Sequence, residues 1–193
     1  PCVLIMAVLF GSSWSGVSLL REITAGTIDK MLVAPTSRLA IVLSRVLHSP
    51  VQVVLQTLII LAVSWAIGAT INGNVLTILL AMIPVFLLGL GFASLSNGLA
   101  IVLQREEPLV VIGNMMTLPL MVFSSAMIPK AFMPEWIQMI SVINPNNYAV
   151  EAVRDSLSGN IKCTDYYMGT GILFVFAMAT LVWAVSAFNA LRD

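Results

Sequence analysis

Long runs of apolar residues divide the chain into stretches that are each close to the length needed to cross a bilayer. A helix needs about 20 apolar residues to span the hydrocarbon core. The third run carries Pro84, Gly89 and Gly91, which offer places for a long helix to bend. The pattern predicts an all-α, polytopic membrane helical bundle, a single domain over residues 1–193. Its predicted spans are Pro1–Leu20, Val46–Ala69, Leu76–Leu103, Leu109–Ile128 and Gly169–Asn189.

The segment between the first two spans, residues 21–45, has a different pattern. It is polar and holds four of the nine Lys and Arg residues. Ile28, Met31 and Leu32 keep a helical rhythm that Pro35 closes, and Thr27 is placed to cap the first turn. We therefore expect a short amphipathic helix here, with a surface on which a soluble partner can act.

The distribution of Lys and Arg predicts the orientation of the spans, because cytoplasmic loops carry the excess of positive charge. Six cationic residues fall on one set of loops, namely Arg21, Lys30, Arg38, Arg45, Arg105 and Arg192. Three fall on the other set, namely Lys130, Arg154 and Lys162. The chain is thus predicted to start outside the cell and to end inside. We also expect that one further span precedes Pro1.

The outer segment, residues 129–168, is too apolar for a plain linker. Pro134 suits the first position of a helix, and Asn144-Pro145 ends it. Asn147 is predicted to cap a second helix. Each helix has one apolar face, so the segment is predicted to form a re-entrant hairpin in the outer leaflet. The two faces are Trp136, Ile137, Ile140 and Ile143, and Ala149, Val150, Val153 and Leu157.

Small and polar residues recur at helical spacing inside the spans. Small residues four apart let helices approach closely, as in Gly11/Ser15, Ser12/Gly16, Gly89/Ala93 and Ser94/Gly98. His48, Gln52 and Gln56 form one polar stripe on the second span. Such groups are costly in hydrocarbon unless they face other helices or water. Hydrogen bonding between helices is the simpler interpretation of the stripe, and a substrate pathway is the alternative.

Composition narrows the class of function. The chain is 59% hydrophobic and 9% charged, against roughly 25% charged residues in soluble domains. Its net charge is zero, which argues against a nucleic-acid partner. One His and two distant Cys do not make a metal site, and no phosphate-binding loop is present. No polar constellation suggests an enzyme. A secondary carrier would need ion-coupling groups, for which His48 is the one candidate.

Both cysteines, Cys2 and Cys163, are predicted to lie on the outer side, where a disulfide is chemically allowed. Nothing in the sequence brings them together, so two unpaired cysteines are the simpler interpretation.

Two motifs make the chain resemble a known family. Arg21-Glu22, Gly26-Thr27 and Met31-Leu32-Val33-Ala34-Pro35 resemble one conserved segment, and Pro134-Glu135-Trp136-Ile137, Asn144-Pro145, Tyr148 and Arg154 resemble another. The chain resembles the membrane subunit of a type-2 ABC exporter, most closely the drug- and antibiotic-export branch, with polysaccharide or glycolipid exporters next. It departs from the pattern at Cys2 and at Asn146-Asn147.

The resemblance implies a six-span subunit of the inner (plasma) membrane that pairs with a second permease copy. ATP and Mg²⁺ would bind a separate ATP-binding subunit, and this chain would hold no cofactor. A coupling helix would dock on that subunit through Arg21, Glu22, Gly26, Thr27, Met31, Leu32 and Pro35. The outer hairpin would act as a gate through Pro134, Trp136, Asn144, Pro145, Tyr148 and Arg154. The implied activity is export of a hydrophobic or amphipathic substrate.

Overall fold

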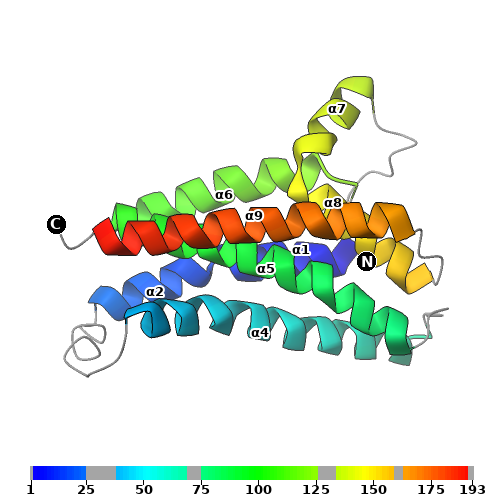
Figure 1. Ribbon diagram of the computed structural model, residues 1–193, viewed down its shortest axis with the longest axis horizontal. Helices are drawn as coiled ribbons and strands as arrows, with labels where there is room; N and C mark the ends of the chain where they lie inside the picture. The colour runs from blue at the N-terminus through cyan, green and yellow to red at the C-terminus, as the bar shows by residue number, and fades with distance from the viewer. Residues whose placement is uncertain (1, 25–37, 69–74, 126–133, 159–162, 191–193) are drawn as a thin grey trace.

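The fold is known from a computed structural model, which describes residues 2–24, 38–68, 75–125, 134–158 and 163–190 (Figure 1). These residues form a bundle of helices, which confirms the prediction of an all-α membrane bundle. The helices are α1 (Cys2–Ser13), α2 (Ser15–Thr24), α4 (Arg38–Ala66), α5 (Val75–Leu103), α6 (Glu106–Val122), α7 (Glu135–Ile143), α8 (Pro145–Ser158) and α9 (Cys163–Ala190).

Helix α5 lies at the centre of the bundle, and the other long helices are arranged around it (Figure 1). It is apolar around its whole circumference, as expected for a helix with neighbours on every side. It continues through Pro84, which cannot donate a hydrogen bond to the carbonyl of Leu80. The hydroxyl of Tyr166 on α9 donates to that carbonyl instead, at 2.7 Å.

Glycines let α5 approach its neighbours closely, as the small-residue spacing predicts. A Cβ added to Gly91 would lie 2.6 Å from the ring of Phe176, and one added to Gly98 would lie 2.4 Å from the ring of Trp183. Gly91 and Gly98 are seven residues apart on α5, and the residues they meet, Phe176 and Trp183, are seven residues apart on α9 in the same order. The two helices therefore run parallel. A Cβ on Gly89 would lie 3.3 Å from Val53 of α4.

The buried apolar residues form two separate clusters along the bundle. We name the clusters after the predicted sidedness. The one called the outer core joins α1 to α4, α5, α8 and α9 and consists of Leu4, Ile5, Val8, Leu9, Val53, Val85, Leu88, Phe92, Ala149, Val150, Val153 and Leu173. The inner core joins α2 to the end of α5 and the start of α6 and consists of Val17, Leu19, Leu20, Ala100, Ile101 and Leu109. Helices α1 and α2 therefore belong to different packing units.

Three described stretches are long and apolar enough to cross a membrane, namely Cys2–Arg21, Leu76–Leu103 and Tyr166–Ala187. They match three of the predicted spans. A shorter apolar stretch, Val51–Ala66, lies within α4. Helix α4 begins at Arg38 rather than near Val46, because good helix formers extend it beyond its apolar part. Helix α6 has 17 residues and ends at Val122, where the outer hairpin meets it.

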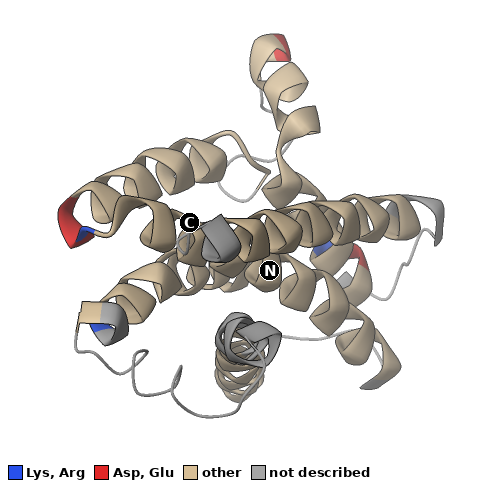
Figure 2. Ribbon diagram, turned by 60° about the vertical axis from the view of Figure 1, so that its left-hand side comes forward, with Lys and Arg blue, Asp and Glu red and all other residues tan. Residues whose placement is uncertain are grey.

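The charged residues whose side chains are described lie toward the ends of the bundle and on α7 (Figure 2). Arg21 and Glu106 are joined at one end, which also carries Arg105. Arg154 lies at the other end, against the residues that follow α6. This grouping matches the two sets of loops that the sequence separates, while the sidedness itself stays a prediction.

Candidate functional site

The first predicted span is broken in its middle, where α1 ends at Ser13 and α2 begins at Ser15. At this break the amide of Gly16 donates to the Oγ of Ser96, 3.0 Å away on α5. The same Ser96 hydroxyl donates to the carbonyl of Ser13. A side chain inserted into the hydrogen-bond ladder is a known cause of a helix kink. Ser96 thus pairs with two of the backbone groups that the break releases, the amide of Gly16 and the carbonyl of Ser13.

Further polar contacts surround the break. Ser15 donates to Oδ1 of Asn97 at 3.1 Å, and the hydroxyls of Ser13 and Thr117 lie 2.9 Å apart. These side chains join α1, α2, α5 and α6 at one level between the two cores. We call the set the polar seam; it consists of Ser13, Ser15, Gly16, Ser96, Asn97 and Thr117. The sequence singled out Ser15 and Gly16 as packing residues, but it gave no sign of Ser96 or Thr117.

Gly16 is required by the close approach at the seam. A Cβ at this position would lie 2.3 Å from the main-chain oxygen of Ser96. A side chain here would force α2 away from α5 and break the hydrogen bond to the Ser96 hydroxyl. The small residues of the first span therefore serve close packing, as predicted.

An open groove lies beside the seam, between α1, α5 and α6. Its lining is mainly apolar, with hydroxyl groups at one place only, and consists of Ser13, Phe92, Leu95, Ser96, Leu99, Leu109, Gly113, Met116 and Thr117. A Cβ on Gly113 would meet no atom within 4 Å, so this part of α6 is loosely packed. Met116 is 42% exposed, and its flexible side chain can adapt to different shapes. The groove is small, about 20 Å³, whereas pockets for drug-sized ligands hold roughly 300–1,000 Å³, so within one chain it does not enclose a ligand of that size.

The predicted pathway stripe on α4 does not line this groove. His48 and Gln52 are exposed on the surface of the described chain, and Gln56 is half-buried. The Oε1 of Gln56 lies 3.3 Å from the position that a Cβ on Gly11 of α1 would take. Gln56 thus lies beside α1, and the role of the stripe stays a prediction.

At the inner end, Arg21 links α2 to α6. Its Nε donates to Oε1 of Glu106 at 3.3 Å, and its Nη2 donates to Oε2 at 3.5 Å. Glu106 also lies at the N-terminus of α6, where the helix dipole favours a negative charge. Of the other predicted coupling residues, Glu22 lies in α2 without a described side chain. The rest lie outside the described residues, namely Gly26, Thr27, Met31, Leu32 and Pro35.

At the outer end, three asparagines hold the C-terminus of α6. The Nδ2 of Asn144 donates to the carbonyls of Leu120 and Phe123 at 2.7 and 3.2 Å. Asn146 donates to the Oγ of Ser124 at 3.1 Å, and Asn147 accepts from the amide of Ser125 at 3.2 Å. The last carbonyls of a helix lack partners within it, so these side chains replace bonds that α6 cannot make for itself. We call these three asparagines the clamp on α6. Asn146 and Asn147, where the sequence departs from the family pattern, are two of its three residues.

The hairpin itself differs in detail from the prediction. Asn144 caps α8, not Asn147, because its Oδ1 accepts the amide of Asn146 at 3.0 Å. Pro145 then takes the first helical position, where its missing N–H costs nothing. Pro134 precedes α7, which begins at Glu135.

The predicted gate residues meet around this hairpin. The Tyr148 hydroxyl donates to the carbonyl of Val142 at 2.7 Å and so ties α8 to α7. The rings of Trp136 and Phe123 meet edge to face, with centroids 6.2 Å apart. Arg154 donates to the carbonyl of Ser125 at 3.2 Å. The free thiol of Cys2 lies 4.0 Å from the same guanidinium, whereas the side chain of Cys163 lies outside the described residues.

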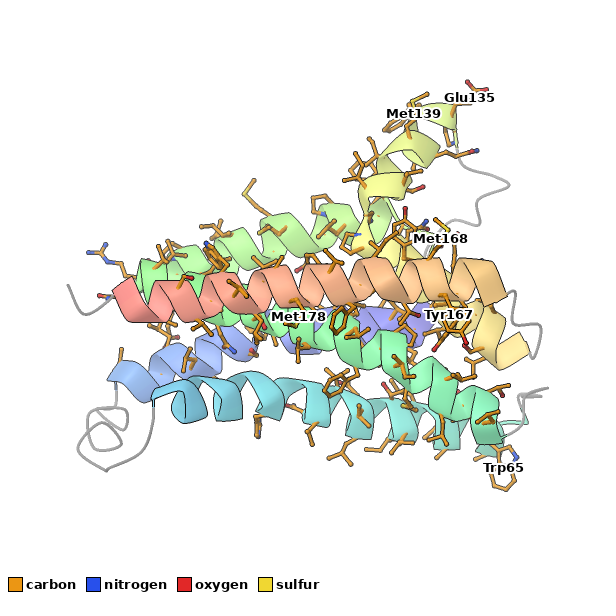
Figure 3. The ribbon with its side chains drawn as sticks, in the orientation of Figure 1. Trp65, Glu135, Met139, Tyr167, Met168 and Met178 are labelled. Atoms are coloured by element: carbon orange, nitrogen blue, oxygen red, sulfur yellow. The ribbon has the colours of Figure 1, made fainter. Side chains whose placement is uncertain are left out.

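Helix α7 points away from the bundle, with Glu135 and Met139 at its far end (Figure 3). Most of its side chains are exposed and apolar, including Met139 at 73% and Ile143 at 84%. Only Ile137 and Ser141 are buried. The helix therefore offers an apolar surface beside the outer end of the bundle, which fits the predicted place in the outer leaflet.

Comparison with known proteins identifies the family. The model of the ABC-2 type transporter family matches residues 1–158. The chain belongs to the ABC-2 type transporter family. This confirms the resemblance drawn from the two motifs.

Several curated relatives of this family are similar to the chain. It is 30% identical over 155 residues to a transport permease, ycf38, of Cyanophora paradoxa, covering 80% of this chain and 53% of that protein. It is 25% identical over 160 residues to DrrC, a doxorubicin resistance ABC transporter permease protein of Mycobacterium tuberculosis; the match covers 82% of this chain and 57% of that protein. It is 23% identical over 185 residues to the daunorubicin resistance ABC transporter permease protein DrrB1 of Streptomyces coeruleorubidus; the match covers 94% of this chain and 65% of that protein. The chain thus spans about half the length of the first of these ABC-2 relatives.

Proposed function

We propose that this chain is the membrane-spanning part of an ATP-driven exporter that moves hydrophobic or amphipathic molecules out of the cell. A separate ATP-binding subunit hydrolyses ATP, and a second permease copy completes the pathway in the inner (plasma) membrane. Membership of the ABC-2 type transporter family supports this activity. The names of the doxorubicin and daunorubicin resistance relatives favour drug-like substrates.

The observation that carries the proposal is the match to the ABC-2 type transporter family over residues 1–158. The small apolar groove beside the polar seam supplies part of a wall that a second permease copy would complete. It combines flexible and aromatic side chains, such as Met116 and Phe92, with the hydroxyls of Ser13 and Thr117. An apolar wall with few polar groups binds molecules by shape and burial rather than by a fixed pattern of hydrogen bonds. This chemistry fits a family of amphipathic substrates better than a single polar one.

The inner end supplies the connection to the ATP-binding subunit. Helix α2 leads directly into the predicted coupling segment, and its last turn is tied to α6 through Arg21 and Glu106. Movement of the coupling segment would therefore pull on α2 and on the start of α6 together. Helix α6 lines the groove, and α2 follows directly on α1, whose last residue Ser13 also lines it, so ATP-driven movement would change its shape.

The test is ATP-dependent transport by the full-length permease reconstituted with its ATP-binding partner in liposomes. Doxorubicin is the probe, because its fluorescence reports accumulation. We expect uptake into inside-out vesicles that requires ATP and is lost with Glu22→Ala or Gly26→Pro, while membrane insertion and partner binding remain. Met115→Ala, on a 72% exposed side chain of α6 outside the groove, serves as the control. Full transport in both coupling variants would refute the proposed coupling role, and absence of ATP-dependent transport in the wild type would refute the drug-export proposal.

A further inference from the structure

The break between α1 and α2 lies where one packing unit of the protein gives way to the other. Leu9, four residues before Ser13, belongs to the outer core, and Val17, two residues after Ser15, belongs to the inner core. The short stretch between them packs against the polar seam. The first membrane helix thus consists of two segments that are held by different sets of neighbours.

The seam supplies partners for two of the backbone groups that the break releases. In a continuous helix, Gly16 would donate to Ser12 and Ser13 would accept from Val17. Here Val17 donates instead to Trp14 at 3.2 Å. The Ser96 hydroxyl accepts from the amide of Gly16 and donates to the carbonyl of Ser13. An unpaired backbone group in hydrocarbon is strongly unfavourable. One hydroxyl therefore stabilises the bent form, because it acts as donor and acceptor together.

A second serine on the same helix shows that this arrangement is not a general property of serines in α5. Ser94 is fully buried, and its hydroxyl donates to the carbonyl of Leu90 in its own helix at 2.7 Å. Ser96 is also buried, at 6% exposure, but its hydroxyl reaches across to the neighbouring helix. The two residues are close in position and burial and differ in the bonds they make.

We propose that Ser96 is a positioning residue for transport: its hydroxyl is the pivot about which α2 bends relative to α1 when the coupling segment moves. This inference rests on the proposed function, and it adds a residue that the two family motifs do not contain. Because Arg21 ties α2 to α6, bending at the pivot moves the inner core and the start of α6 against the outer core. Ser13 and Ser96 line the groove, so the shape of the groove changes with the bend.

The test compares Ser96→Ala with Ser94→Ala in the full-length permease assembled with its ATP-binding partner. We expect Ser96→Ala to lower the transport of doxorubicin per ATP hydrolysed by about tenfold, since loss of the inserted hydroxyl disfavours the bent state by roughly that factor. ATP hydrolysis itself continues, and Ser94→Ala keeps the wild-type ratio. An unchanged ratio in Ser96→Ala at normal assembly would overturn the proposal.

A structural measurement keeps the inference independent of transport. Spin labels at the exposed positions Val3 and Ser18 report the bend, in a background with Cys2→Ser and Cys163→Ser. Labelled copies are diluted with unlabelled ones so that the distance lies within one chain. We expect Ser96→Ala to shift the separation toward the about 22 Å rise of a straight 15-residue helix, and Ser94→Ala to leave it in place. No shift in Ser96→Ala would overturn the pivot even if the exporter proves to move another substrate.

Should Ser96→Ala fail to assemble, Ser96→Cys takes its place, since a thiol fills similar space and is a weaker hydrogen-bond partner. We then expect a smaller fall in transport per ATP, measured without spin labels because the new thiol would itself be labelled. A wild-type ratio of transport to ATP hydrolysis in an assembled Ser96→Cys complex would refute the role of the hydroxyl.

Discussion

Tyr166 donates a hydrogen bond of 2.7 Å to the main-chain carbonyl of Leu80. This is the carbonyl that Pro84 leaves without its helical donor, because proline has no N–H. The contact joins α9 to α5, and each of these helices contains an apolar stretch long enough to cross a membrane. The tyrosine thus compensates for the proline.

Tyr166→Phe should destabilise the protein by about 1–2 kcal/mol, because it leaves a part-buried carbonyl without a donor. Thermal unfolding of the purified protein in detergent measures the loss. Tyr167→Phe is the control, since Tyr167 is 71% exposed. Addition of Pro84→Ala should restore much of the stability, because alanine supplies an amide to Leu80. Failure of this second substitution to compensate would show that the hydroxyl acts elsewhere.

The glycines along α5 and α6 should differ sharply in their tolerance of alanine. Gly98→Ala places a methyl group 2.4 Å from the ring of Trp183, and overpacking of this kind costs about 1–3 kcal/mol. Gly113→Ala meets no atom within 4 Å and should stabilise α6 slightly, since alanine is the better helix former. Unfolding temperatures of the two variants check the contrast, and equal effects would argue against the close packing of α5 on α9.

Much of the fold follows from local pattern. The length and uniform hydrophobicity of Leu76–Leu103 predicted α5 within one residue of its observed start, and Asn144-Pro145 marked the boundary between α7 and α8. Both signals depend on neighbouring residues alone. The cap on α8 was assigned to Asn147 because that residue precedes the apolar face, whereas the structure uses Asn144, whose side chain also reaches α6.

The polar seam could not be predicted in the same way. The break at Ser13 depends on Ser96, which is 83 residues away in sequence, and no local pattern distinguishes it from a continuous helix. The pairing of Arg21 with Glu106 is likewise long-range, over 85 residues. Residue type indicated that each could bond, but only the packing of α2 against α5 and α6 brought the partners together.

Asn144 has two separate roles that substitution can distinguish. Asn144→Ala removes the cap of α8 and the bonds to Leu120 and Phe123, and we expect it to lower stability by about 2–4 kcal/mol. Asn144→Asp keeps the cap oxygen but replaces the donor with an acceptor that faces two carbonyls. If the clamp on α6 matters most, both variants lose stability in thermal unfolding. A stable Asn144→Asp protein would assign the role to the cap alone.

The ion pair between Arg21 and Glu106 should affect coupling more than folding. Both side chains are largely exposed, at 70% and 42%, and exposed pairs contribute at most about 1 kcal/mol to stability. We therefore expect Arg21→Glu to leave the unfolding temperature nearly unchanged and to lower transport per ATP, because α6 no longer follows α2. The exchanged pair, Arg21→Glu with Glu106→Arg, should recover transport. Arg105→Glu, at the exposed residue directly before α6, is the matched control for charge at this end of the bundle. If the single and exchanged variants transport equally poorly while Arg105→Glu is normal, Arg21 acts through another partner.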